Sequence, residues 1–284
     1  MIGYTGLKTC NIGYKGENMQ IGCCLSMNAN ERDSIGINTL EDAIKAGYDY
    51  IELPVSNMMA LDDGARDAIL KKVIDAGLPC YSGNNLFPPG IKLLEDKTSY
   101  AAISEYLNRA LDYCKRLDMK VLVFGSGGAR MRPDGMTLDQ GHEKLEKLLH
   151  LMAGLAEKFD ITFVLETLRR EESNILNTMA ETRKLQGAVS HPRIKMLCDN
   201  YHMSFAGEKP QSDIVPVISD IKHAHFCRVK GRVIPNTELL EDEKEYVLTL
   251  INNGYEGNLS VEAYSQDFIN DSEFIVKQLK SITE

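Results

Sequence analysis

The chain has 284 residues, which is enough for two ordinary domains or for one α/β barrel, a fold that typically needs about 250 residues. Hydrophobic residues make up 43% of the chain and charged residues 26%, as in globular proteins with a large core, so extensive disorder is excluded. The formal net charge of -9 argues against binding to nucleic acid or to an anionic membrane surface, because no basic segment compensates it.

Cysteine usage and apolar patterning indicate the compartment. Seven cysteines include no CxxC pair, and Cys23 and Cys24 stand together in an apolar run, which is typical of small buried side chains in a reducing environment. No apolar stretch approaches the length of about 20 residues that a membrane helix needs. We therefore expect a cytoplasmic protein. Residues 1–18 show no clear period, so we predict an N-terminal extension there and one folded domain over residues 19–284.

From Met19 onward, short apolar runs alternate with longer segments of helical period. Eight such pairs in series predict an α/β protein with a single (β/α)8 barrel. A doubly wound open sheet is the alternative, but no GxGxxG follows the first strand. The predicted strands lie within residues 19–27, 48–55, 78–87, 120–127, 161–168, 194–202, 221–229 and 258–264. The predicted helices lie within residues 39–47, 65–77, 100–118, 142–160, 178–189, 212–220, 243–254 and 273–282.

Polar residues end four consecutive predicted strands. These residues are Glu166, Asp199, His225 and Glu262, on the fifth to eighth strands. In a closed barrel the carboxyl ends of the strands meet at one mouth, so we expect the four side chains to converge. Three carboxylates in an apolar mouth repel one another, and a divalent cation is the simplest remedy. The mostly oxygen donor set favours Mn²⁺, with Mg²⁺, Co²⁺ and Zn²⁺ as alternatives.

Two histidines, His223 and His225, lie in the seventh predicted strand. We expect alternation along the strand to let only one of them point toward the other ligands. We choose His225 and assign His223 to packing or support. Each ligand also has a simpler explanation, since Glu is common at helix starts and an Asp-x-x-His turn is often a helix cap. The repetition on four adjacent strands favours the metal site.

Three further residues follow these strand ends. Glu172, His202 and Arg232 are predicted to contact a substrate. A solvated charged loop is the alternative for Glu172, and a surface salt bridge is the alternative for Arg232.

Other candidates precede the four ligands in the chain. Glu52, in the second predicted strand, could support the site, and Asn84 and Asn85 could bind substrate hydroxyl groups. For residues 125–130, with the sequence GSGGAR, we favour a flexible glycine-rich loop over an anion-binding nest.

Five motifs resemble a known family. VFGSGGAR, VLETLRREESN, LCDNYHM, HAHF and GNLSVEAY are similar to segments of the xylose-isomerase-like TIM barrels, specifically the sugar isomerase and epimerase group that includes D-tagatose 3-epimerase and D-psicose 3-epimerase. The resemblance runs from about Met19 to the C-terminus. It implies that two glutamates serve both as metal ligands and as acid and base. The ligands it implies are Glu166, Asp199, His225 and Glu262.

The same resemblance implies that Glu172 and His202 contact substrate oxygens. The substrate-binding Arg of the family lies six residues after the metal His, where this chain has Gly231 followed by Arg232. The chain also has no Trp, whereas the named epimerases use Trp in the pocket. These departures indicate an altered substrate.

Together these residues predict a metal-dependent isomerase whose partner is a small-molecule ketose or related keto sugar. One glutamate removes a proton next to the carbonyl, the cation stabilises the enediolate, and the other glutamate returns a proton, which gives an epimer or an aldose-ketose isomer. A lyase or dehydratase acting on a keto sugar or inosose, including C-glycoside cleavage, would use the same groups. A sugar-binding barrel without catalysis would not need two glutamates around a metal.

We expect neither nucleic acid nor a membrane as a partner. Endonuclease IV, a DNA-cutting relative with a trinuclear zinc cluster, needs more ligands than the six histidines here supply and a basic surface that the sequence lacks. The sequence is compatible with a homo-oligomer.

Overall fold

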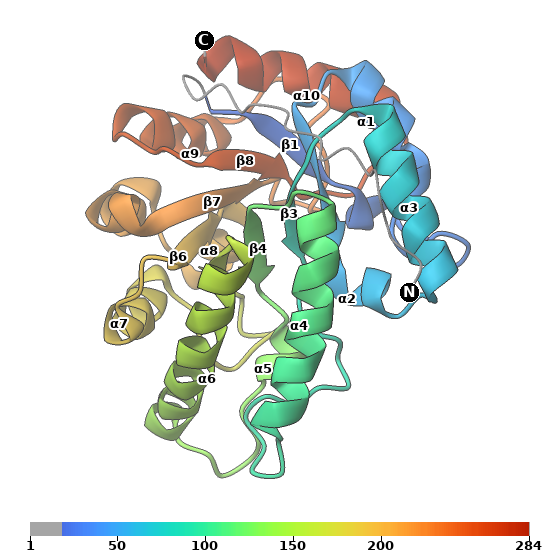
Figure 1. The fold of residues 1–284 in the computed structure, drawn as a ribbon. Coiled ribbons are helices and arrows are strands. Elements are labelled where there is room, and N and C mark those ends of the chain that lie inside the picture. Colours follow the sequence, from blue (N-terminus) through green and yellow to red (C-terminus); the bar gives the residue numbers. More distant parts are fainter. Residues whose placement is uncertain (1–18, 284) are drawn as a thin grey trace.

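The computed structural model describes residues 19–283, so the predicted extension over residues 1–18 lies outside the described residues. Eight parallel strands close into one barrel in the order of the chain, and β1 pairs directly with β8. The prediction of a (β/α)8 barrel is confirmed, and the open-sheet alternative is wrong. Figure 1 shows the helices packed around the outside of the strands.

All eight strands lie within the predicted segments. They are short apolar runs, buried on both faces because helices cover the outside and side chains fill the inside of the barrel. The strands are β1 (Ile21–Cys24), β2 (Tyr50–Pro54), β3 (Cys80–Asn84), β4 (Val121–Phe124), β5 (Thr162–Glu166), β6 (Ile194–Asp199), β7 (Ile221–Phe226) and β8 (Asn258–Val261).

Most helices also match the predicted segments. Each places an apolar stripe on the barrel, and α1 and α3 end at Gly47 and Gly77, which have left-handed backbone. The α-helices are α1 (Leu40–Ala46), α2 (Val55–Met59), α3 (Asp63–Ala76), α4 (Tyr100–Arg116), α5 (Gly127–Arg130), α6 (Leu138–Phe159), α7 (Met179–Val189), α8 (Asn200–Ala206), α9 (Glu241–Asn252) and α10 (Phe268–Thr283). Shorter turns are η1 (Leu25–Asn28), η2 (Ile37–Thr39), η3 (Pro210–Ile214) and η4 (Val215–Asp220).

Two kinds of difference from the prediction have physical reasons. The segment 212–220 forms the turns η3 and η4 rather than an α-helix, because Pro216 has no N–H to continue an α-helical ladder. The short helices α2, α5 and α8 follow strands closely and were not predicted. Their lengths of four to seven residues are too short to show a helical period.

Tyr50 fills the barrel interior beside a glycine. Gly22 in β1 is the register partner of Tyr50 in β2, and a Cβ atom at Gly22 would lie 2.3 Å from the tyrosine ring. The fully buried ring places its hydroxyl 2.9 Å from the Oγ of Ser260 in β8. Gly22 therefore makes room for an aromatic side chain that links β2 to β8.

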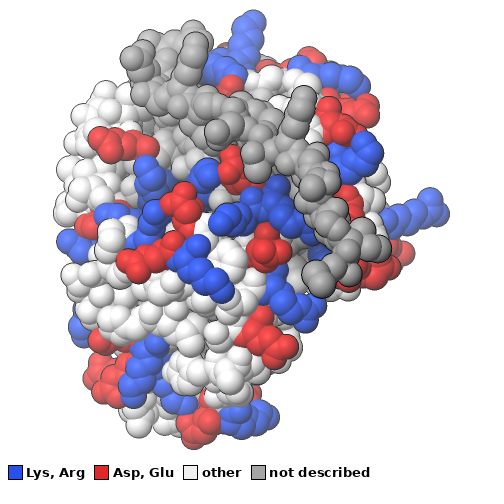
Figure 2. Space-filling model, viewed as in Figure 1, with Lys and Arg blue, Asp and Glu red and all other residues white. Residues whose placement is uncertain are grey.

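The surface is mixed in charge. On the face shown in Figure 2, Lys and Arg side chains are interspersed with Asp and Glu side chains rather than gathered into one basic area. Among residues 19–283, none of the helices has both the length and the apolar character that crossing a membrane requires.

The space at Gly22 leads to a prediction about stability. Gly22→Ala is expected to lower the free energy of unfolding by about 1–3 kcal/mol, because the added methyl group overlaps the Tyr50 ring. The matched control is Gly154→Ala in α6, where no atom lies within 4 Å of the added Cβ and stability should rise by about 0.5–1 kcal/mol. Urea denaturation measures both changes. Equal effects at the two positions would contradict the packing described for Tyr50.

Candidate functional site

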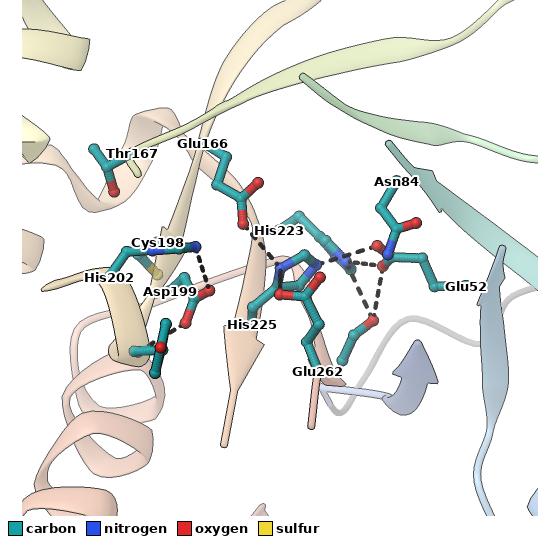
Figure 3. A network of polar contacts seen from close by, with 12 residues as sticks. Glu52, Asn84, Glu166, Thr167, Cys198, Asp199, His202, His223, His225 and Glu262 are labelled. Atoms are coloured by element: carbon teal, nitrogen blue, oxygen red, sulfur yellow. Dashed lines mark hydrogen bonds and ion pairs between the residues drawn. The ribbon is translucent and has the colours of Figure 1, made fainter. Parts of the chain in front are cut away.

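Four side chains from consecutive strands meet at the carboxyl end of the barrel. Glu166 and Asp199 are the last residues of β5 and β6, His225 lies one residue before the end of β7, and Glu262 directly follows β8. One ligand atom from each of the four lies within 4.8 Å of the others. Figure 3 shows the four side chains gathered around a common volume. These are the four residues that the sequence analysis selected as a set.

The imidazole of His225 lies between carboxylates. Its Nδ1 is 3.2 Å from Oε1 of Glu166 and 3.2 Å from Oε2 of Glu262, and its Nε2 is 3.2 Å from Oε1 of Glu52. Burial lowers the pKa of His225, but Glu262 and Glu52 raise it more, so the pKa lies well above its usual value. The protonated imidazole thus balances part of the negative charge in the metal-free protein.

The three carboxylates of the cluster differ in their electrostatics. Burial raises the pKa of Glu166, and burial raises the pKa of Asp199 to about 6 although Arg232 opposes the shift. Burial also acts on Glu262, but Arg232 and His225 outweigh it and lower the pKa of Glu262 to about 2. Glu262 therefore stays ionised, whereas ionising Glu166 and Asp199 costs free energy unless a further cation is present.

Asp199 offers an oxygen to a cation. Its Oδ1 accepts a hydrogen bond of 2.8 Å from the backbone N–H of Tyr201 and so caps α8, whereas its buried Oδ2 accepts none from the described residues. A buried carboxylate oxygen without a hydrogen bond is costly, and the longer contacts with His202 at 3.5 Å and Arg232 at 3.7 Å offset only part of the cost. A helix cap was the alternative explanation for Asp199. The cap involves only Oδ1, so Oδ2 remains available to the cluster. This donor set of carboxylate oxygens and one imidazole fits a divalent cation such as Mn²⁺.

The segment 125–130 shapes the space around Glu166. A Cβ atom at Gly125 would lie 2.0 Å from Oε2 of Glu166. The fully buried guanidinium of Arg130 donates hydrogen bonds to the backbone carbonyls of Phe124, at 2.9 Å, and Glu166, at 2.6 Å. In place of the flexible loop that was expected, the segment forms α5 and packs its arginine beneath the site. The sequence analysis did not predict this role of Arg130. The available signal was an Arg at the end of a glycine-rich turn that follows a strand.

His202 lies beside Asp199 on α8. Its Nδ1 accepts a hydrogen bond of 3.2 Å from the backbone N–H of Arg169, which leaves the proton of the neutral imidazole on Nε2. Nε2 lies 3.5 Å from Oδ2 of Asp199. Burial lowers the pKa of His202, so the ring is neutral at pH 7 and presents one N–H toward the cluster.

Arg232 closes the cluster from the loop after β7. Gly231 and Arg232 both have left-handed backbone, with φ of 86° and 50°, and the guanidinium of Arg232 donates a hydrogen bond of 2.5 Å to Glu262. It also lies 4.6 Å from the centre of the Tyr201 ring. Arg232 is thus largely buried in the site, and the surface salt bridge proposed as its alternative is wrong.

Glu172 and the asparagines lie farther from the cluster. Glu172 pairs with Arg169 at 2.7 Å and approaches Arg232 at 4.0 Å, so it borders the site rather than a fully solvated loop. Asn84 is buried and points inward with its Oδ1 unpartnered, whereas Asn85 is exposed. Of the two asparagines, the structure brings only Asn84 toward the barrel interior (Figure 3).

A cavity of about 620 Å³ borders Arg232, whose guanidinium reaches Glu262, while the four residues of the cluster are not in its lining. Its volume is typical of small-molecule sites. Its lining includes Glu172, Tyr201, Arg232 and Tyr264, so two of the predicted substrate contacts border it.

The expectation that only one of the two histidines points into the barrel was wrong. His223 and His225 are two residues apart, and side chains with that spacing point to the same face of a strand. Both are buried inside the barrel, and both approach the carboxylate of Glu52, at 2.8 Å from His223 and 3.2 Å from His225. Burial raises the pKa of Glu52, but the two imidazoles outweigh it and hold the pKa well below its usual value.

Comparisons with known proteins agree with this architecture. A family model for the xylose isomerase-like TIM barrel matches residues 40–283. A ketose 3-epimerase of Arthrobacter globiformis is 23% identical over 256 residues, which cover 88% of this chain and 86% of that protein. A D-allulose 3-epimerase from Methylomonas sp., solved in complex with D-allulose, superposes with a TM-score of 0.78 at 17% identity and covers 93% of this chain and 97% of its own. A 3-keto-D-glucoside 4-epimerase from E. coli has a TM-score of 0.75 at 16% identity, with 93% and 99% covered. At these identities the structural likeness shows the shared fold alone.

The contact between Gly125 and Glu166 predicts an effect on the cluster. Gly125→Ala is expected to displace the Glu166 carboxylate, because the added Cβ lies 2.0 Å from Oε2, and to weaken Mn²⁺ binding by about tenfold or more. Isothermal titration calorimetry measures the affinity. Gly128→Ala in the same short helix is the control, since no atom lies within 4 Å of its added Cβ. An unchanged affinity in Gly125→Ala would show that the Glu166 carboxylate does not contribute to a metal site.

Proposed function

This chain belongs to the xylose isomerase-like TIM barrel family, and from that premise we propose that it is a divalent-metal-dependent sugar isomerase that epimerises a ketose or a related keto sugar. The observation that carries the proposal is the approach of Glu166 and Glu262, from β5 and from the end of β8, to the same nitrogen of His225 at 3.2 Å each. Similar proteins named ketose 3-epimerases support C3 of a ketose as the carbon that is inverted.

We propose that Glu166, Asp199, His225 and Glu262 hold the cation, with Mn²⁺ as the favoured ion. The buried Oδ2 of Asp199, which lacks a hydrogen bond from the described residues, supports this role. When bound, a divalent cation supplies Lewis acidity that stabilises negative charge on substrate oxygens.

The two glutamates would act as acid and base. Glu166 ends β5 and Glu262 directly follows β8, three places further around the barrel, so they can reach a substrate carbon from different directions. One removes the proton next to the carbonyl and the other returns a proton to the opposite face of the same carbon, which gives the epimer. Arg232 favours the ionised form of Glu262 and lowers its pKa, which keeps a proton acceptor available.

Three neighbouring side chains would bind the sugar. His202 presents its Nε2–H toward the cluster, where it can donate to a substrate oxygen. Arg232 can also donate, and Glu172 can accept from a hydroxyl group, since both border the adjoining cavity. These contacts would orient the substrate between the glutamates.

The first test of this proposal follows the exchanged proton. Mn²⁺-loaded protein is incubated in D₂O with a panel of ketoses, inososes and 3-keto-glycosides, and the separated sugars are analysed by NMR. We expect deuterium at one carbon next to a carbonyl, together with the epimer. In Glu166→Gln and in Glu262→Gln, formation of the epimer should fall at least about 100-fold with an unchanged circular dichroism spectrum, because inversion needs one glutamate to remove the proton and the other to return one.

Other outcomes of that experiment would contradict the proposal. Loss of water or release of a fragment would instead identify a dehydratase or lyase. Near-normal epimer formation in either Gln variant would exclude the two-glutamate mechanism. Neither exchange nor epimer formation with any sugar of the panel would contradict the proposed activity.

The second test separates ligands from substrate contacts. Mn²⁺ at about 100 times its dissociation constant should stabilise the protein by about 2.7 kcal/mol, because the ion binds the folded state, and the melting temperature should rise accordingly. Asp199→Asn should lose this shift. His202→Ala should keep it and raise KM for the sugar. If His202→Ala lost the shift instead, His202 would be a ligand.

A further inference from the structure

We infer that Glu52 is a positioning residue, which holds the imidazole of His225 so that Nδ1 faces the metal cluster. The inference rests on the proposed metal-dependent function, to which it adds the residue behind the histidine ligand. Glu52 lies in β2, on the far side of the His225 ring from Glu166 and Glu262 (Figure 3).

The carboxylate of Glu52 is fully buried and accepts several hydrogen bonds. Its Oε2 receives the hydroxyl of Ser82 at 2.7 Å and that of Ser260 at 3.0 Å, and it lies 2.8 Å from Nε2 of His223. Its Oε1 lies 3.2 Å from Nε2 of His225. One oxygen is therefore fixed by three partners, which directs the other oxygen at His225.

This arrangement distinguishes the two nitrogens of His225. A neutral imidazole carries its proton on one nitrogen and a lone pair on the other, and the partner of the protonated nitrogen decides which is which. Both nitrogens face carboxylates, but a cation in the cluster would displace the proton from Nδ1, whereas Nε2, which faces the acceptor Glu52 outside the cluster, would keep its proton. The lone pair is then on Nδ1, 3.2 Å from both Glu166 and Glu262, where a cation would be bound.

The surroundings of Glu52 restrict its movement. Ser260, which donates to Glu52, also lies 2.9 Å from the hydroxyl of Tyr50, and the Tyr50 ring is packed against Gly22. The support of His225 thus extends from the cluster to a packed layer of the barrel interior, and the carboxylate has no exposed side toward which it could turn.

Cys24, Glu52 and His225 also lie close enough together to form a second group of possible ligands. We assign Glu52 to support rather than to a second ion, because its Oε2 already has three hydrogen-bond partners, Ser82, Ser260 and His223. Metal stoichiometry separates these two assignments.

The test compares two Glu→Gln substitutions by calorimetry with Mn²⁺. In Glu52→Gln the side chain keeps its shape but offers a single acceptor oxygen where four donors converge, so the amide cannot replace the carboxylate. We expect one ion per chain in the wild type and an affinity about 10–100-fold weaker in Glu52→Gln. The matched control is Glu181→Gln, which changes another glutamate that lies 2.9 Å from a histidine nitrogen, in the pair with His142 outside the barrel. Its Mn²⁺ affinity should not change.

A second readout needs no variant. In Zn²⁺-loaded wild-type protein labelled with ¹⁵N at histidine, the ring of His225 should bear its proton on Nε2 and bind the metal through Nδ1. Coordination through Nε2 would overturn the inference, even if Glu52→Gln failed to fold.

The remaining outcomes separate this inference from the function on which it rests. An unchanged Mn²⁺ affinity in folded Glu52→Gln would overturn the role of Glu52 and leave the metal centre intact. Two ions per wild-type chain would make Glu52 a ligand instead. Absence of Mn²⁺ binding by the wild type would contradict the proposed function itself.

Discussion

The burial of several carboxylates at one end of a closed barrel is the constraint on which the site depends. Glu52, Glu166, Asp199 and Glu262 share this volume with two cationic side chains, His225 and Arg232. Burial raises the pKa of Glu166 and of Asp199, and the negative charge of Glu262 adds to both shifts, although His225 and Arg232 oppose them. The cluster is therefore costly by itself, and a divalent cation would relieve the cost.

Successive layers of the barrel interior stabilise the buried carboxylates. At the mouth, Arg232 pairs with Glu262, and one layer deeper two histidines and two serines surround Glu52. Below them the Tyr50 ring packs against Gly22. Each layer limits the movement of the one above it. The cluster is therefore held by a packed interior, although its residues come from four different strands or strand ends. Rigid placement of this kind is what a proton-transfer site requires.

The errors of the sequence interpretation concern side-chain direction and short elements. Only one of His223 and His225 was expected to point inward, although their spacing places both rings inside the barrel. The GSGGAR segment was taken as a flexible loop, because an Arg at the end of a glycine-rich turn does not by itself show that its side chain turns inward to reach the carbonyl of Glu166. The segment 212–220 has helical spacing of apolar residues, but Pro216 interrupts the α-helical hydrogen bonds. The effect of this proline outweighs the apolar spacing.

The sequence by itself determined the barrel and the residues of the cluster, because eight repeated strand-helix units admit few folds and a barrel brings its strand ends to one mouth. Only the tertiary structure decided what surrounds the cluster. The contact of Glu52 with His225, the space that Gly125 leaves for Glu166 and the turn that brings Arg232 to Glu262 join residues from different strands and loops. Such contacts depend on register and side-chain direction across the barrel, and no local sequence pattern encodes them.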